Sequence, residues 1–116
     1  MASRLCPSTP VRQRRPRQET PSHLDFIRGL PCAVCGNPHQ TEAAHVRMTE
    51  LRYGKFQAGI GAKPADQWTL PLCNKHHRIQ HEIGCEETFW RDAKIDPFVL
   101  ALSLWAANQD QERAEL

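Results

Sequence analysis

Two pairs of metal-ligand residues, Cys32-x2-Cys35 and Cys73-x2-His76, are the most specific feature of this sequence. Three thiolates and one imidazole, arranged as two close pairs, are what a tetrahedral structural zinc site requires. Buried free thiols and a surface histidine are the alternative. We predict the zinc site, because a bound metal can supply much of the folding free energy of a domain this small.

A second group of histidines follows directly. His77 and His81 are four residues apart, so on a helix they share one face and can bind one divalent ion together. His76 and His77 point about 100° apart on a helix, which assigns them to two different metals. An exposed polar helix face is the alternative. His45 ends a short apolar segment, and its neutral imidazole is suited to take a proton from water near neutral pH.

The elements that must position these residues follow from capping signals and apolar spacing, and they predict an α+β fold. We expect two short strands joined by a long glycine-containing loop, with helices on either side of them in the chain. The expected strands are 43–47 and 68–73, the loop is 48–66, and the helices are 22–28, 75–83, 86–93 and one that begins at Asp96-Pro97.

The composition bounds the class of protein. The chain has 116 residues, of which 40% are hydrophobic and 24% charged, which excludes collagen-like, coiled-coil and wholly disordered chains. Five cysteines, an odd number, beside six histidines favour a metal site over disulfide bridges. The longest nearly apolar run, 98–107, is too short to span a bilayer, and no export signal is present. We therefore expect a cytoplasmic protein without membrane contact, whose thiols stay reduced.

The net charge of +2 is unevenly distributed. Residues 1–20 carry five arginines and one glutamate, a net charge of +4, and the rest of the chain carries −2. Together with its prolines, this composition predicts a flexible basic arm that can neutralise nucleic-acid phosphates; a solvated tail without a role is the alternative. We divide the chain into this arm, a domain over 21–106 and a polar tail over 107–116.

The order of the motifs resembles the zinc-knuckle branch of the HNH endonucleases. The order begins with Cys-x2-Cys, continues with a histidine that ends a strand and then a loop, and closes with Leu72-Cys73-x2-His76-His77-x3-His81. More narrowly, Gly61–Asp66, Leu70–Cys73 and Phe89-Trp90 resemble small phage and prophage HNH proteins close to the Ref-type recombination-enhancement nucleases. The resemblance covers roughly residues 22–105. It implies that the domain has the ββα-metal (His-Me finger) HNH fold, with a structural zinc knuckle and flanking helices.

The resemblance also implies residue roles. His45 would be the general base, His77 and His81 would bind the catalytic ion, and the two ligand pairs would hold zinc. The family usually has a metal-binding residue where this chain has Ala44, and its middle asparagine would fall near Trp68.

Asp66 is the candidate replacement for the missing groups, either as a partner of His45 or as a third metal ligand. In another assignment His45 is itself a ligand, and the base is unknown.

The resulting expectation is a metal-dependent DNA endonuclease that hydrolyses phosphodiester bonds and leaves a 5′-phosphate. It would have low sequence specificity or be directed by DNA structure, use Mg²⁺, Mn²⁺, Ni²⁺ or Zn²⁺, and act in phage or prophage DNA processing or recombination. The expected phosphate contacts are Lys63, Arg52, Lys55 and Arg78, with Arg12, Arg14, Arg15 and Arg17 of the arm.

Two other functions fit the same residues. The first is a catalytically inactive, zinc-stapled nucleic-acid-binding module, and the second is a zinc-stabilised protein adaptor. A host recombination protein or a phage DNA-processing protein could recruit the chain.

Overall fold

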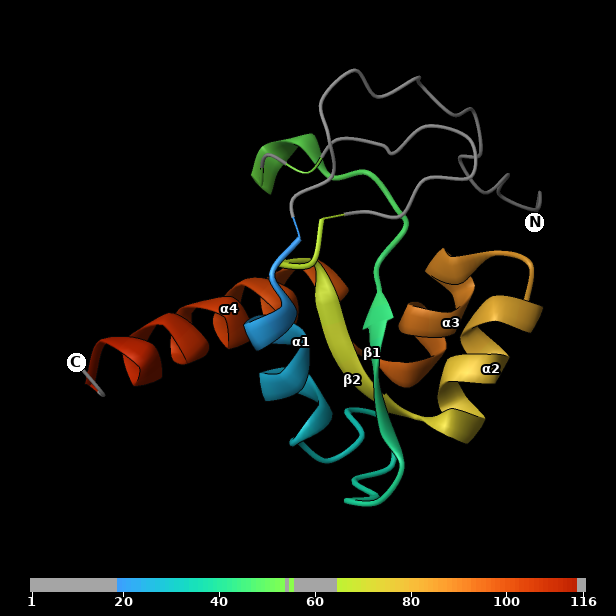
Figure 1. The fold of residues 1–116 in the computed structure, drawn as a ribbon. Helices are drawn as coiled ribbons and strands as arrows, with labels where there is room; N and C mark the ends of the chain where they lie inside the picture. Colours follow the sequence, from blue (N-terminus) through green and yellow to red (C-terminus); the bar gives the residue numbers. More distant parts are fainter. Residues whose placement is uncertain (1–18, 54, 56–64, 115–116) are drawn as a thin grey trace.

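A two-stranded antiparallel sheet lies at the centre of this computed structural model, which describes residues 19–53, 55 and 65–114 (Figure 1). Helices α1 and α4 lie on one side of the sheet, and α2 and α3 lie on the other. The elements are α1 (Pro21–Arg28), β1 (Thr41–His45), the 3-10 helix η1 (Leu51–Tyr53), β2 (Thr69–Cys73), α2 (Asn74–Glu82), α3 (Glu86–Ala93) and α4 (Pro97–Ala114). The α+β class is therefore confirmed.

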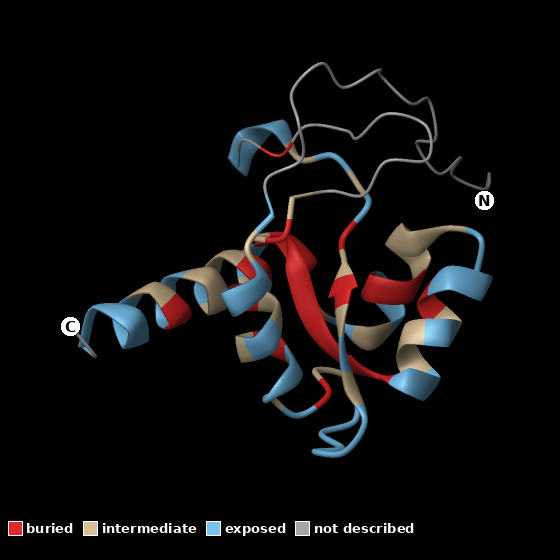
Figure 2. Ribbon diagram, viewed as in Figure 1, coloured by how far each residue is buried: buried red, intermediate tan, exposed pale blue. Residues whose placement is uncertain are grey.

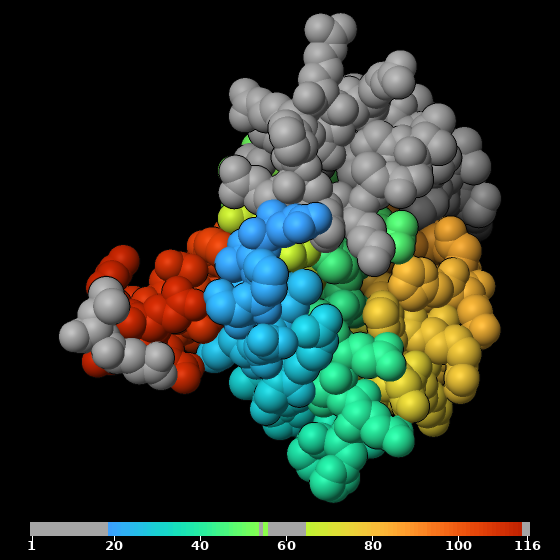
Figure 3. All heavy atoms as spheres, in the orientation of Figure 1, coloured from blue at the N-terminus to red at the C-terminus, as the bar shows by residue number. Residues whose placement is uncertain are grey.

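The register of the sheet fixes where the candidate residues stand. Thr41 pairs with Cys73 at one end of the sheet, and His45 pairs with Thr69 at the other. All five residues of β2 are buried, whereas β1 is buried only at Ala44 (Figure 2). In the space-filling view, atoms of β1 and of the loop before it reach the surface between α1 and α2 (Figure 3). One strand therefore belongs to the core, and the other brings polar side chains to the surface.

The core joins the sheet to the helices on both sides. Leu70 and Leu72 of β2 have no exposed surface, and Trp90 of α3 is 1% exposed. Trp68 packs edge-on against Phe98 of α4, with ring centroids 6.3 Å apart. These large side chains bury apolar surface on both sides of the sheet and hold the two strands in place.

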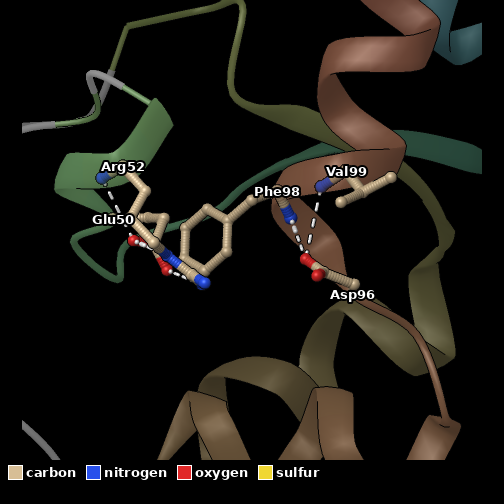
Figure 4. Close-up of polar contacts among 5 residues, drawn as sticks. All are labelled: Glu50, Arg52, Asp96, Phe98 and Val99. Atoms are coloured by element: carbon tan, nitrogen blue, oxygen red, sulfur yellow. Dashed lines mark hydrogen bonds and ion pairs between the residues drawn. The ribbon is translucent and has the colours of Figure 1, made fainter.

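Helix α4 differs from the expected C-terminal tail. Its start is as predicted, because Oδ1 of Asp96 accepts hydrogen bonds from the backbone N–H groups of Phe98 and Val99 (Figure 4). The helix then continues to Ala114 instead of giving way to a polar tail at 107. Asn108 is 4% exposed, and its Nδ2 donates a hydrogen bond to Nδ1 of His23 in α1. This contact holds a segment whose polar composition predicted a tail without contacts to the domain.

Two other expectations fall partly outside the described residues. The basic arm lies there up to residue 18, as do Gly54 and residues 56–64 of the long loop. The described part of the loop contains η1 and an isolated bridge between Glu50 and Lys55. No helix of the described chain is long and apolar enough to cross a membrane.

Candidate functional site

The two predicted ligand pairs meet at one point, where a loop, a strand and a helix converge. Cys32 and Cys35 lie between α1 and β1, Cys73 ends β2, and His76 is in the first turn of α2. Their ligand atoms all lie within 4.8 Å of one another. We call these four residues the cysteine–histidine cluster.

The spacing in the cluster fits a tetrahedral metal. Sγ of Cys35 is 3.9 Å from Sγ of Cys73, and Nδ1 of His76 is 3.7 Å from Sγ of Cys32 and 3.2 Å from Sγ of Cys73. Zinc–sulfur bonds of about 2.3 Å in a tetrahedron imply ligand separations of about 3.8 Å. The cluster can therefore bind a metal ion such as zinc.

Local backbone geometry explains why the first pair adopts this turn. Gly36 has a φ of +78°, which disfavours any residue with a side chain, and its N–H donates to the carbonyl of Cys32 at 2.8 Å. The N–H of Ala33 donates to the carbonyl of Pro71 at 2.8 Å, which fixes the turn on β2. Burial alone would raise the pKa of the Cys32 thiol, but hydrogen bonds from the backbone of Cys73, Cys35 and Val34 lower it to about 6. The thiolate that a metal needs is thus favoured near neutral pH.

A second cluster lies between β1 and α2. Nε2 of His77 is 3.2 Å from Nε2 of His81, so the structure brings together the two histidines that share a helix face. Oε1 of Glu42, on β1, is 2.6 Å from Nδ1 of His77. We call Glu42, His77 and His81 the histidine site. The sequence analysis missed Glu42, because its partner could be identified only once the packing of β1 on α2 was known.

His81 favours its neutral form. Its pKa is lowered by desolvation, and by the neighbouring His77 and Arg47, whereas Glu86 acts in the opposite direction. A metal-binding imidazole must be neutral, so this environment suits a ligand.

His45 and Asp66 form a separate pair. Nε2 of His45 is 2.9 Å from Oδ1 of Asp66, and Oδ2 of Asp66 accepts the N–H of Thr20 at 2.8 Å. Asp66 is 1% exposed. The structure therefore places Asp66 beside His45.

The alternation of side chains along β1 separates this pair from the histidine site. Glu42 and Ala44 point to one face of the strand and His45 points to the other, because successive residues of a strand alternate. Gln80 of α2 connects that helix to β1, since its Nε2 donates to the backbone carbonyl of His45 at 3.2 Å. The candidate catalytic residues thus form two groups on either side of β1.

Glu86, at the start of α3, is another residue that the sequence analysis missed. Its carboxylate accepts hydrogen bonds from the backbone N–H of Arg47 at 3.1 Å, from Nε2 of Gln80 at 3.0 Å and from Nε1 of Trp90 at 2.8 Å. These donors come from the segment after β1, from α2 and from α3. One carboxylate therefore joins the elements that surround the histidine site.

The predicted phosphate contacts differ in accessibility. Arg78 is exposed on α2, and the side chain of Arg52 is 74% exposed although it is paired with Glu50 at 2.7 Å (Figure 4). Lys55 differs from the expectation: it is 1% exposed, because the chain turns back at its bridge with Glu50 and the side chain packs inward. Burial lowers the pKa of Lys55 to about 8, against the opposing effect of Glu86. Lys63 and the four arginines of the arm lie outside the described residues.

A groove of about 450 Å³ lies beside Arg52, between η1 and the junction of α3 with α4. Trp90 and Phe98 line it, and positively and negatively charged side chains are mixed along it. Neither metal-ligand cluster opens into this groove, so it is separate from the candidate chemistry.

Comparisons with known proteins give a family. No solved structure matches the chain. "Uncharacterized protein YdfU" of Escherichia coli (strain K12) is 34% identical over 68 residues, which are 59% of this chain and 18% of YdfU. The chain thus spans less than a fifth of the length of this curated relative. A family model described as "Protein of unknown function (DUF968)" matches residues 8–90, a range that contains both clusters and His45. The chain belongs to the DUF968 family.

Proposed function

We propose that this protein is a metal-dependent DNA endonuclease of the HNH type, with low sequence specificity or directed by DNA structure, that acts in phage or prophage DNA processing. The observation that carries the proposal is the histidine site. Two imidazoles have their Nε2 atoms 3.2 Å apart on the helix that directly follows an antiparallel strand pair, next to a zinc-type cluster. The same order of elements is what the resemblance to ββα-metal nucleases implies.

The two groups around β1 have complementary roles in this proposal. A divalent ion bound by His77 and His81 would stabilise the negative charge that develops on the phosphate and the leaving oxygen. In this proposal Asp66 accepts a hydrogen bond from Nε2–H of His45, and Nδ1 would be the nitrogen that takes a proton from the attacking water. The ring thereby acts as the general base in its neutral form.

Asp66 also connects the basic arm to the proposed general base, His45. Thr20, the last residue of the arm, donates its backbone N–H to the same carboxylate that pairs with His45. The arginines of the arm would contact DNA phosphates, which makes binding depend strongly on salt. Arg78 and Arg52 are exposed and would add contacts to the backbone.

Plasmid nicking tests the proposal. We expect the full chain to nick supercoiled DNA with at least one of Mg²⁺, Mn²⁺, Ni²⁺ or Zn²⁺, and His45→Ala to be slower by about 100- to 10,000-fold. His39→Ala, in an exposed loop, is the matched control and should nick at the rate of the unsubstituted chain. Equal nicking by His45→Ala would overturn the assignment of the base, and equal nicking by the double variant His77→Ala with His81→Ala would overturn the ion site.

One observation favours a second candidate, an inactive nucleic-acid-binding module. His45 points to the face of β1 opposite Glu42, and Ala44 occupies the position of the expected metal ligand. Salt-dependent DNA binding in a fluorescence anisotropy titration, without nicking in any of the four metals, would establish this function instead.

A further inference from the structure

We propose that Glu42 is a positioning residue that fixes the ring of His77 so that Nε2 faces a divalent ion shared with His81. This inference rests on the ion site of the proposed function. It assigns a role to a residue that neither the motif spacing nor the family resemblance indicated.

The contacts around His77 carry the argument. Oε1 of Glu42 lies 2.6 Å from Nδ1 of His77, a distance typical of a strong hydrogen bond to a charged acceptor. A carboxylate accepts only, so Nδ1 must carry the proton. In a neutral ring the lone pair is then on Nε2, the atom that lies 3.2 Å from Nε2 of His81.

The elements explain why Glu42 can hold this position. It lies on β1, opposite Leu72 in the register, on the face of the strand that packs toward α2. Its side chain is half exposed, whereas that of His77 is 22% exposed. The strand is fixed by the core, so the carboxylate is held by a rigid element rather than by a loop. Carboxylates that hold the second nitrogen of a histidine ligand orient the ring and make it a better donor to the metal.

Metal titration of the zinc-loaded full chain tests the proposal. We expect Glu42→Ala to bind Ni²⁺ about 10- to 100-fold more weakly than the unsubstituted chain, and Glu42→Gln, which keeps an acceptor oxygen, to lie between them. Glu82→Gln removes the same charge from an exposed position on α2 and should not change the affinity. His81→Ala defines the signal expected when the site is lost.

A second measurement separates this proposal from the ion site itself. In the metal-free histidine site, long-range ¹⁵N NMR above neutral pH should show His77 protonated at Nδ1, and Glu42→Ala should lose this preference. If the unsubstituted chain binds Ni²⁺ and Glu42→Ala keeps both the affinity and the tautomer, the role of Glu42 is refuted while the ion site stands. If no variant binds Ni²⁺, the ion site fails, and with it the metal-positioning role, even where the tautomer is as expected.

Discussion

The two clusters share helix α2 but differ in how the rest of the fold encloses them. In the cysteine–histidine cluster, Cys32 and Cys73 are each 3% exposed, His76 is half-buried and Cys35 is exposed, and the four ligands come from a loop, a strand end and a helix. In the histidine site, both histidines come from α2, and the side chain of Glu42 is 50% exposed. Structural metal sites are closed by protein ligands, whereas catalytic sites keep a position open. The first cluster therefore has the ligand set of a structural metal site, whereas the second offers two imidazoles from one helix at the surface.

The boundary between them is a single peptide bond. His76 turns toward the cysteines and His77 turns toward Glu42, because adjacent residues on a helix point about 100° apart. A metal that fixes His76 thus also fixes the start of the helix that carries His77 and His81. A metal in the cysteine–histidine cluster would therefore support the histidine site without sharing a residue with it.

Removing a cysteine ligand should abolish folding. We expect Cys73→Ser to lose bound zinc and cooperative thermal unfolding, because zinc binding by such a site contributes on the order of 10 kcal/mol. Circular dichroism and elemental analysis measure both effects. Cys85→Ser, which replaces a half-buried thiol outside the cluster, is the control and should keep both. Chelation of the unsubstituted protein should have the same effect as Cys73→Ser; cooperative unfolding that survives it would show that the cluster does not stabilise the fold.

Removing the Glu86 carboxylate should weaken the surroundings of the histidine site and leave the other cluster loaded. Glu86→Ala deprives the donors of Arg47, Gln80 and Trp90 of their acceptor, so we expect a loss of about 2–4 kcal/mol in the free energy of unfolding. Glu86→Gln retains one acceptor oxygen and should lose less. Urea denaturation with a parallel zinc measurement tests this, and an unchanged midpoint for Glu86→Ala would contradict it.

Acid should destabilise the contact between α1 and α4 independently of both clusters. His23 has no exposed surface, and burial lowers its pKa from 6.5, against opposing effects of Asp66 and Glu112. Below pH 6.5 the unfolded chain therefore binds more protons than the folded one. The stabilisation that comes from keeping His23 neutral in the fold is complete above pH 6.5, and it decreases as the pH falls through the lower pKa of the folded state.

Urea denaturation as a function of pH measures this effect. The free energy of unfolding of His23→Leu should depend less on pH below 6.5 than that of the unsubstituted chain. His39→Ala is the control, because its side chain is exposed, and it should keep the full dependence. Identical pH dependence in His23→Leu and the unsubstituted chain would assign the acid sensitivity to other groups.

Removing both imidazoles of the histidine site should change stability least. We expect His77→Ala with His81→Ala to alter the free energy of unfolding by about 1 kcal/mol or less, since the site lies at the surface of α2, and yet to lose Ni²⁺ binding. Calorimetry measures both quantities. A loss of folding comparable to that of Cys73→Ser would mean that both clusters are structural.

Local periodicity was enough to predict several features from the sequence. The spacing of Cys32 and Cys35, and of Cys73 and His76, predicted a cluster that the structure assembles. The four-residue interval of His77 and His81 predicted a shared helix face, and their rings meet there. The spacing within each pair can be predicted because turn and helix geometry depend on neighbours in the chain, whereas the packing of the fold brings the two cysteine-containing pairs together.

Long-range packing decided the rest. The pairing of Glu42 with His77, the bond from Arg47 to Glu86 and the inward position of Lys55 each join segments that only the fold brings together. The helix that replaces the expected tail depends in the same way on the contact of Asn108 with His23. A polar residue carries no local signal of which distant group will satisfy it, so its role is settled only when burial forces its hydrogen-bonding groups to find partners.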